Sequence, residues 1–314
     1  MRTPIVEARA WIAVAAAVLI GCGGSPRDGA GPEDGARSAA PGGRGGSAPA
    51  GGGAGADAGA GAAASGGGAT GASGGAVDGG GAAADCASLA VCEDFETATA
   101  FGHAPDAKGW HVAHPNCAGT GAIAVTDQVA RSGKRSLRVD GAAGYCNHVF
   151  LANEKATGGA GPLFLRFYVR IDRPLGDDHV TLLAMKDRTS GKDLRFGGQK
   201  QVVIWNRESD DATLPELSPA GVAKSVAPAA LAWHCVEIAI DGPAITTRID
   251  GASIAGLRAA TPPTPDVDQT WQRSGAYAPA PADVRVGWES YGNGAATLWL
   301  DDIAASTAPI GCGA

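Results

Sequence analysis

Apolar and polar side chains alternate with a period of two through most of the chain after residue 90, as in strands that bury one face. In Leu163–Ile171, every odd-numbered residue is large and apolar. No twelve-residue segment carries an apolar stripe at helical spacing, and the connections are too short for helical crossovers. We therefore predict an all-β fold, a sandwich or jelly roll of two antiparallel sheets. The other segments with this pattern are 123–126, 136–139, 149–151, 180–185, 202–205, 234–241, 245–249, 284–288 and 297–303.

Residues 23–84 contain 24 Gly and 19 Ala, so most of these positions carry almost no side chain. Such a segment cannot bury enough apolar surface to offset the entropy of the chain, and we expect a disordered linker. The chain then divides into a signal peptide at 1–21, a linker at 22–84 that begins with a lipidated Cys22, and a β-domain at 85–314.

The first 21 residues have the composition of an export signal. Two arginines precede an apolar segment at 11–20, which is too short to cross a membrane as a helix. The sequence Leu19-Ile20-Gly21-Cys22 resembles a bacterial lipobox, in which the cysteine is lipidated and becomes the new N-terminus. An ordinary secretory signal is the alternative. We expect a protein of the cell envelope that faces the periplasm or the exterior and is attached to the membrane by lipid alone.

Six cysteines remain once Cys22 is assigned to the lipid, and an even number in an exported domain indicates disulfides. Several pairings are possible for six thiols. A metal site is disfavoured, because no two cysteines have the Cys-x-x-Cys spacing. The pairing that we favour is Cys86–Cys92, Cys117–Cys146 and Cys235–Cys312.

The formal net charge of the chain is −7, and no segment is dense in Lys or Arg. These features disfavour nucleic acid as a partner. We also expect a monomer.

Six segments together resemble a known family, the fungal cellulose-induced proteins and their bacterial relatives. The resemblance covers most of residues 91–312 and implies a concanavalin-like jelly roll, related in shape to glucuronan and alginate lyases. Proteins of this class include lyases, hydrolases and lectin-like binders, and the paired Gln-x-His strand of alginate lyases is not present here. The six segments are Val91-Cys92-Glu93-Asp94-Phe95-Glu96, Arg131-Ser132-Gly133-Lys134-Arg135-Ser136-Leu137, Leu165-Arg166-Phe167-Tyr168-Val169, Leu194-Arg195-Phe196-Gly197-Gly198-Gln199, Trp233-His234-Cys235-Val236-Glu237 and Leu300-Asp301-Asp302-Ile303.

A lyase of this kind performs β-elimination on a uronic acid. The reaction needs a group that neutralises the sugar carboxylate, a base for the neighbouring proton and an acid for the leaving oxygen. Arg195 and Gln199 are four residues apart, hence on one face of an extended segment, and both suit the carboxylate. We predict His179 as the base and Tyr168 as the acid. The alternative is that these are polar groups on a solvated sheet face.

Five further residues are predicted to bind substrate. Trp205 could stack on a sugar ring, although core packing is an equal alternative for it. Glu237 has no evident second carboxylate beside it, so hydrolysis by a carboxylate pair ranks below elimination. The five residues are Trp205, Asn206, Arg166, Glu237 and His148.

The resemblance also implies a structural Ca²⁺. Glu96 and Asp301 would lie side by side if the first and last strands pair, and hard oxygen ligands suit this ion. Asp301 and Asp302 could instead cap the end of a strand. Three functions remain open: a lipid-anchored, polysaccharide lyase-like enzyme that acts on a uronic-acid-containing glycan, a non-catalytic glycan-binding lipoprotein, and a purely structural protein of the envelope. For the first two, the expected partner is a polysaccharide.

Overall fold

The structure is a computed structural model that describes residues 86–89, 91–145, 147–157, 159, 161–208, 227–254 and 278–312. The predicted signal peptide, the lipidation of Cys22 and the linker lie outside the described residues. All described residues belong to one unit, which spans residues 72–314. None of the helices in this part of the chain is long and apolar enough to cross a membrane.

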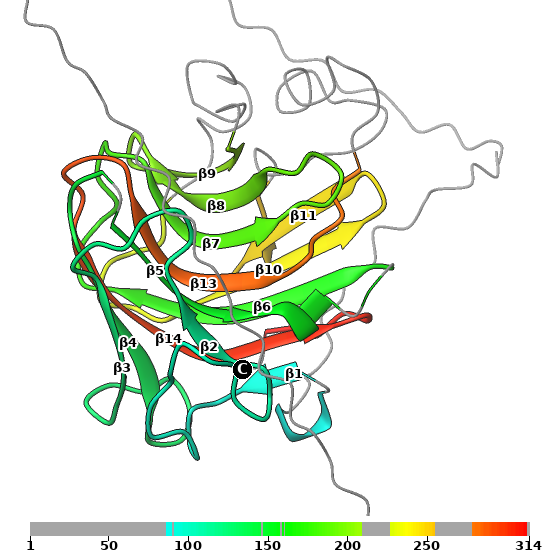
Figure 1. Ribbon diagram of the computed structural model, residues 1–314, viewed down its shortest axis with the longest axis horizontal. Coiled ribbons are helices and arrows are strands. Elements are labelled where there is room, and N and C mark those ends of the chain that lie inside the picture. Colours follow the sequence, from blue (N-terminus) through cyan, green and yellow to red (C-terminus); the bar gives the residue numbers. More distant parts are fainter. Residues whose placement is uncertain are drawn as a thin grey trace, which may run out of the picture. The chain divides into compact units, whose positions relative to one another are not determined.

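Two antiparallel sheets make up the described domain and are stacked face to face (Figure 1). Within the described residues the large sheet has eight strands and the small sheet has six, and two short 3₁₀ helices accompany them, Cys86–Ser88 and Glu154–Thr157. In order of pairing, the large sheet consists of β12 (Ala252–Ser253), β11 (Ala244–Ile249), β10 (His234–Asp241), β6 (Leu163–Ile171), β14 (Ala296–Ser306), β4 (Ser136–Gly141) and β3 (Ala122–Thr126), with β1 (Val91–Glu93) also paired to β14. The small sheet consists of β2 (His111–Ala113), β5 (Asn147–Asn153), β13 (Val284–Ser290), β7 (Val180–Lys186), β8 (Asp193–Gln199) and β9 (Val202–Arg207).

This architecture confirms the predicted all-β sandwich of two antiparallel sheets. Each segment with the alternating pattern is a strand or lies within one. The strands that the pattern did not mark are β1, β2, β8 and β12. Pairing of β1 with β14 brings the first and last strands together, as the calcium hypothesis required.

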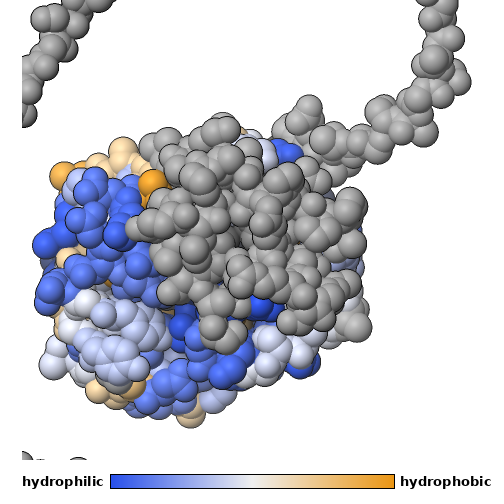
Figure 2. All heavy atoms as spheres, turned by 90° about the horizontal axis from the view of Figure 1, so that it is seen from above, coloured by the Kyte–Doolittle hydropathy of each residue, from blue (hydrophilic) through white to orange (hydrophobic). Residues whose placement is uncertain are grey.

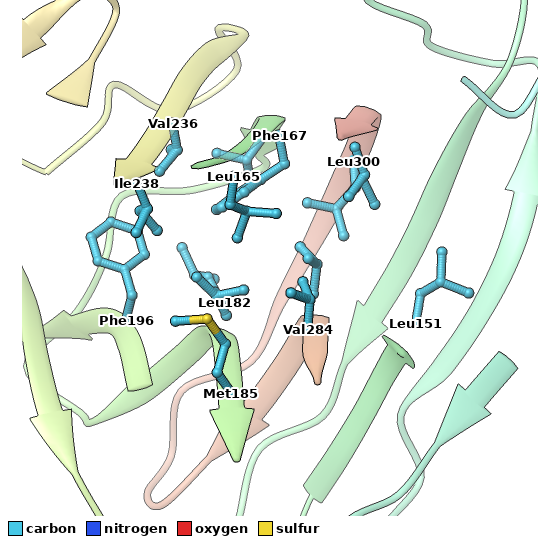
Figure 3. Packing of buried hydrophobic residues seen from close by; sticks show 14 of the residues in the cluster. Leu151, Leu165, Phe167, Leu182, Met185, Phe196, Val236, Ile238, Val284 and Leu300 are labelled. Atoms are coloured by element: carbon cyan, nitrogen blue, oxygen red, sulfur yellow. The ribbon is translucent and has the colours of Figure 1, made fainter. Parts of the chain in front are cut away.

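The core lies between the two sheets. Leu165 and Phe167 of β6 point from the large sheet toward Leu182 and Met185 of β7 in the small sheet (Figure 3). All four side chains are buried. The polar residues that alternate with core residues therefore lie on the two outer faces of the sandwich.

Two-residue turns connect several neighbouring strands. Lys200 and Gln201 join β8 to β9 with φ angles of 53° and 64°, and Asp250 and Gly251 join β11 to β12 with φ angles of 52° and 77°. Two successive left-handed residues are the geometry of a type I′ hairpin turn, whose twist matches that of the strands. The short turns keep consecutive strands side by side in the sheets.

Two of the three favoured disulfides are confirmed, Cys86–Cys92 and Cys235–Cys312. Cys117 is also disulfide-bonded, and its favoured partner Cys146 lies outside the described residues. Since Cys235 is in β10, its bond to Cys312 fixes the C-terminal segment to the large sheet.

Candidate functional site

The outer face of the small sheet carries a row of polar side chains across neighbouring strands. Arg195 on β8 lies opposite Asn206 on β9. Glu289 on β13 lies opposite His148 on β5 and opposite Thr181 on β7. Residues directly opposite one another share a face of the sheet, and the alternate residues of these strands point into the core. The register therefore brings these polar groups together.

Glu289 is the centre of this group. Its Oε1 atom lies 3.1 Å from an Nη atom of Arg195 and 3.8 Å from Nε2 of His148. All three side chains are buried. A buried carboxylate between a guanidinium and an imidazole holds both in fixed positions, because removing either partner would leave charge without compensation.

Tyr291 lies next to this group, immediately after β13. Its ring is stacked on that of His179 at 5.2 Å, lies 5.7 Å from the ring of His148, and has the guanidinium of Arg195 5.2 Å from its centroid. The backbone N–H of Tyr291 donates to the carbonyl of His179. Burial, together with the hydrogen bond and negative charge of Glu289, raises the pKa of the Tyr291 hydroxyl well above its usual value. At neutral pH this hydroxyl keeps its proton.

Hydrogen bonds fix the orientation of the two imidazoles. Nδ1 of His148 lies 2.7 Å from the carbonyl oxygen of Pro115, which can only accept, so Nδ1 donates this hydrogen bond. Nε2 of His148 takes no part in it and has no hydrogen-bond partner among the described residues. Nε2 of His179 lies 2.9 Å from the side-chain nitrogen of Asn206.

The structure thus brings together Arg195, His179, His148 and Asn206 from the residues predicted to form the site. Gln199 follows Arg195 by four residues on β8 and lies on the same face of the strand, as the spacing predicted. Gly197, between them, leaves no room for a side chain, because a Cβ atom there would lie 2.0 Å from the carbonyl oxygen of Val180.

Four predicted residues are elsewhere, and their assignments are corrected here. Tyr168, Arg166 and Glu237 are on β6 and β10 of the large sheet, separated from the cluster by the core. Trp205 on β9 points into the core, where its ring contacts Phe196. Its side chain is 1% exposed, so it cannot stack on a sugar.

Each of the three residues on the large sheet has local partners instead. A nitrogen of Arg166 donates to the carbonyl of Gly311, and the ring of Tyr168 lies 4.0 Å from the guanidinium of Arg131. Burial raises the pKa of Glu237, against the opposing charges of Arg248 and Arg166. These groups hold the C-terminal segment on the large sheet.

Sequence reasoning did not select Tyr291 or Glu289. The alternation of β13 could have identified Glu289, because its neighbour Trp288 belongs to the core and Glu289 must face the other way. Tyr291 lies beyond the strand in a Gly-rich turn, where no periodicity indicates a direction. Its position is evident only in the structure, where its backbone N–H donates a hydrogen bond to the carbonyl of His179.

Glu96 and Asp301 bind the same loop, residues 131–135. Oε1 of Glu96 accepts hydrogen bonds from the backbone of Lys134 and Arg135, and Oδ2 of Asp301 accepts from the backbone of Arg131. Burial, and the neighbouring charge of Asp302, raise the pKa of Asp301 to about 7, although the amides of the loop oppose this shift. The two adjacent carboxylates of Asp301 and Asp302, with the hydroxyl of Ser132 hydrogen-bonded to Asp302, are compatible with a hard cation.

Within the described residues, a single group of three metal-binding side chains has its ligand atoms within 4.8 Å of one another: Cys235, Glu237 and Cys312. Its two cysteines form a disulfide, so it lacks the thiolates that a metal would need. A cation near Asp301 would therefore draw some of its ligands from backbone or hydroxyl oxygens.

The fold places the domain in the class of jelly rolls with two antiparallel sheets. The outer face of its small sheet carries the cluster of histidine, tyrosine and arginine side chains. The sequence pattern of the Cip1-like core domain, which is polysaccharide lyase-like, matches residues 99–308, and the chain belongs to this family. The structure of the cellulose-induced protein Cip1 is 36% identical over 71% of this chain and 100% of that chain, with a TM-score of 0.63. Comparison with curated proteins gave no match.

Two more distant structures resemble the domain in outline. An endo-β-1,4-glucuronan lyase from the fungus Trichoderma reesei is 15% identical over 67% of this chain and 96% of that chain, with a TM-score of 0.40. A xylan-binding domain, CBM22-1 of Paenibacillus barcinonensis Xyn10C, is 13% identical over 72% of this chain and 96% of that chain, with a TM-score of 0.33. Likenesses at this level say nothing of the activity of the chain described here.

Proposed function

We propose that the polar face of the small sheet binds a uronic-acid-containing polysaccharide and cleaves it by β-elimination. The observation that carries the proposal is the contact of Arg195, His148 and Tyr291 around one buried carboxylate, Glu289. These are the group types that elimination needs: a cation for the uronate, a base and a proton donor.

Arg195 and Gln199 are assigned to the carboxylate of the sugar. Hydrogen bonds and positive charge at this carboxylate make the neighbouring C5–H more acidic, because they stabilise the negative charge that develops there. Arg195 already contacts Glu289, but its Nε atom has no hydrogen-bond partner among the described residues. That N–H group is a donor that a bound carboxylate could use.

His148 and Tyr291 are assigned to proton transfer. Nε2 of His148 takes the proton from C5, the electron pair of that bond forms the C4–C5 double bond, and the C4–O4 bond breaks. The hydroxyl of Tyr291, which keeps its proton at neutral pH, gives that proton to O4. His179, predicted earlier as the base, is assigned to positioning Tyr291, because its ring stacks on that of Tyr291 while its Nε2 contacts Asn206.

The test is the ultraviolet absorbance of the unsaturated product when the full chain is incubated with glucuronan, alginate and other polyuronates. Tyr291→Phe and His148→Ala are each expected to lower kcat by about 10²- to 10⁴-fold on the polymer that reacts. Arg166→Lys on the large sheet is the control and should leave kcat unchanged. Normal rates in both variants of the small sheet would contradict the proposal.

Non-catalytic glycan binding is the second candidate function. The ion pair between Arg195 and Glu289 favours this function, because Glu289 already neutralises part of the positive charge of Arg195 and less of that charge is available to a bound uronate. A chain that binds polyuronates, loses this binding in Arg195→Ala and releases no unsaturated product from any of them would have this function instead.

We propose further that the loop at residues 131–135 binds a structural Ca²⁺ with Glu96 and Asp301. The ion would supply positive charge to the buried carboxylates and tie the loop to strand β14. Support comes from the burial of Asp301 and from the adjacent carboxylate of Asp302. The pairing of β1 with β14 brings residues near both ends of the domain to this loop.

Lipid attachment through Cys22 is likewise a proposal, which rests on the sequence Leu19-Ile20-Gly21-Cys22. It would place the domain at a membrane surface in the cell envelope. Partition of the full chain into detergent, and its loss in Cys22→Ser, is the test. Equal partition of both chains would exclude lipid attachment at this residue.

A further inference from the structure

A cavity lies on the opposite side of the sandwich from the proposed active site. It has a volume of about 380 Å³. Tyr168 and Cys235, directly opposite each other on β6 and β10, form part of its floor. Both alternate with core residues, so they point away from the core on the outer face of the large sheet. The cavity and the small-sheet cluster therefore cannot contact the same sugar.

Aromatic and polar groups converge on this cavity. Trp233, which is half-buried, precedes β10, and the guanidinium of Arg131 lies 4.0 Å from the ring centroid of Tyr168. Asp250 comes from the β11–β12 turn, and its carboxylate is about half exposed. A cavity with aromatic walls and a few convergent polar groups is the usual form of a small-ligand site.

The positions of the polar groups are fixed by the fold. Oδ1 of Asp250 accepts a hydrogen bond from the backbone of Cys235 at 2.9 Å, and Oδ2 lies 2.6 Å from Nδ1 of His234. Arg131 contacts Asp302 at 3.4 Å. Because these contacts are made within the chain itself, binding would order few additional side chains.

The charges indicate which ligand the cavity would take. Arg131 already contacts the carboxylate of Asp302, and Asp250, whose Oδ2 lies beside Nδ1 of His234, adds a half-exposed carboxylate to the cavity. An added carboxylate would be repelled by Asp250, while Arg131 is already paired with Asp302. Arg166, 5.7 Å from the ring of Tyr168, already donates to the carbonyl of Gly311. A neutral sugar would instead give hydroxyl groups to Asp250 and present its apolar ring face to Trp233.

We propose that this cavity is a second glycan-binding site, which holds a neutral pyranose residue on the outer face of the large sheet. Trp233 provides the stacking surface, Asp250 accepts hydrogen bonds from the sugar hydroxyls, and Arg131 donates to them. The site does not depend on β-elimination at the small sheet. It would let the domain hold a neutral polysaccharide while the other face contacts a uronate.

The test uses the full chain and tetrasaccharides of β-linked glucose, α-linked glucose, β-linked xylose and glucuronic acid. Binding is followed by tryptophan fluorescence and calorimetry. At least one neutral tetrasaccharide should bind, and Trp233→Ala should weaken its affinity tenfold or more. Leu231→Ala is the matched control, since Leu231 is exposed two residues away and does not line the cavity. Its affinity should stay within twofold of the unaltered chain.

Two more variants separate this proposal from other outcomes. Arg195→Ala on the small sheet should leave binding of the neutral sugar unchanged, whatever it does to uronates. Asp250→Asn keeps a residue that tolerates the left-handed turn and removes the charge, so binding of tetraglucuronate at the cavity should increase. Failure of all neutral sugars to bind, unchanged affinity in Trp233→Ala, or loss of binding in Arg195→Ala would overturn the proposal.

Discussion

Arg285 and Asp193 form a buried ion pair beside the proposed active site. Two nitrogens of Arg285 contact the two carboxylate oxygens of Asp193 at 3.0 and 2.7 Å. Burial alone would raise the pKa of Asp193, but the hydrogen bonds and charge of Arg285 outweigh burial and hold that pKa below its usual value. The pair joins β13 to β8, the strands that carry Glu289 and Arg195.

This pair should make the stability of the domain depend on pH. Because folding lowers the pKa of Asp193, its contribution is complete above the unfolded pKa, about 4, and is lost as pH falls through the folded value. Asp193→Asn should lose about 3 kcal/mol near neutral pH. In urea unfolding, its deficit relative to the unaltered chain should shrink below about pH 4. Asp172→Asn, at a more exposed pair, is the control. A deficit that does not change with pH would contradict this account.

Tyr145 is an exposed aromatic residue at the edge of the proposed active site. Its side chain is 73% exposed, and its ring lies 5.5 Å from that of Tyr291 in an edge-to-face arrangement. If the small sheet cleaves a polyuronate, Tyr145→Ala should raise KM about tenfold, which corresponds to about 1.4 kcal/mol, with kcat within twofold. Tyr145→Phe should behave like the unaltered chain. An unchanged KM would remove Tyr145 from the substrate path.

For single residues, the sequence predicted which residue types form the site better than it predicted where each residue lies. The spacing of Arg195 and Gln199 placed both on one face of a strand, because a strand has a strict period of two. For Trp205 the choice between core and sugar depended on which face of β9 meets the other sheet, and only the packing decides that. The prediction for Tyr168 was wrong because β6, which carries it, and the next strand β7 belong to different sheets.

Among the elements, the β8–β9 turn is the clearest case of local strain. Lys200 and Gln201 both have positive φ, which is unfavourable for residues other than Gly, Asn and Asp. Their backbone N–H groups donate to the carbonyls of Asp177 and Gly176. The turn therefore supports the segment that leads to His179.

Lys200→Asn should relieve part of this strain. Asn adopts the left-handed conformation more readily, and the backbone bond to Asp177 stays, so the free energy of unfolding should rise by about 0.5–1 kcal/mol. Urea unfolding measures the change. Lys200→Val is the opposite control, because a β-branched residue disfavours positive φ. Equal stability of the two variants would contradict the role assigned to backbone strain.

Long alternating strands were predictable because burial of one face determines their residue types. Strand β8 was not marked as a strand, since Gly197 and Gly198 have no side chains to show alternation. Close approach of neighbouring groups requires both glycines: a Cβ at Gly198 would lie 2.7 Å from the side chain of Leu175. Strands β1 and β2 have three residues each, too few to show a period.

For the molecule as a whole, the Cys235–Cys312 bond closes a loop with a sequence separation of 77 residues. Replacing both cysteines by serine should lower the free energy of unfolding by about 4 kcal/mol, because the unfolded chain gains the freedom that the bond removes. The same change at Cys86 and Cys92, separated by six residues, should cost about 2 kcal/mol. Chemical unfolding measures both. A larger loss from the short loop would contradict the entropic explanation.

Calcium, if bound as proposed, should stabilise the whole domain, since its site joins β14 to the loop before β4. At a concentration of about 100 times Kd the gain is about 2.7 kcal/mol, so the unfolding temperature should rise by several degrees with Ca²⁺ and fall with EGTA. Asp301→Asn should abolish this response. Mg²⁺ at the same concentration is the control. Equal responses to Ca²⁺ in both chains would exclude Asp301 as a ligand.

Strand β14 occupies the middle of the large sheet, between β6 and β4, and it also pairs with β1 (Figure 1). The coloured part of the face seen in Figure 2 is mostly hydrophilic, whereas the core residues of β14 are buried between the two sheets. During synthesis, residues 296–306 are made after every other strand of the two described sheets. Until they are made, β6 and β4 each lack a neighbour, and the sandwich cannot close. A nascent chain of this protein must therefore be kept from aggregating until β14 has been made.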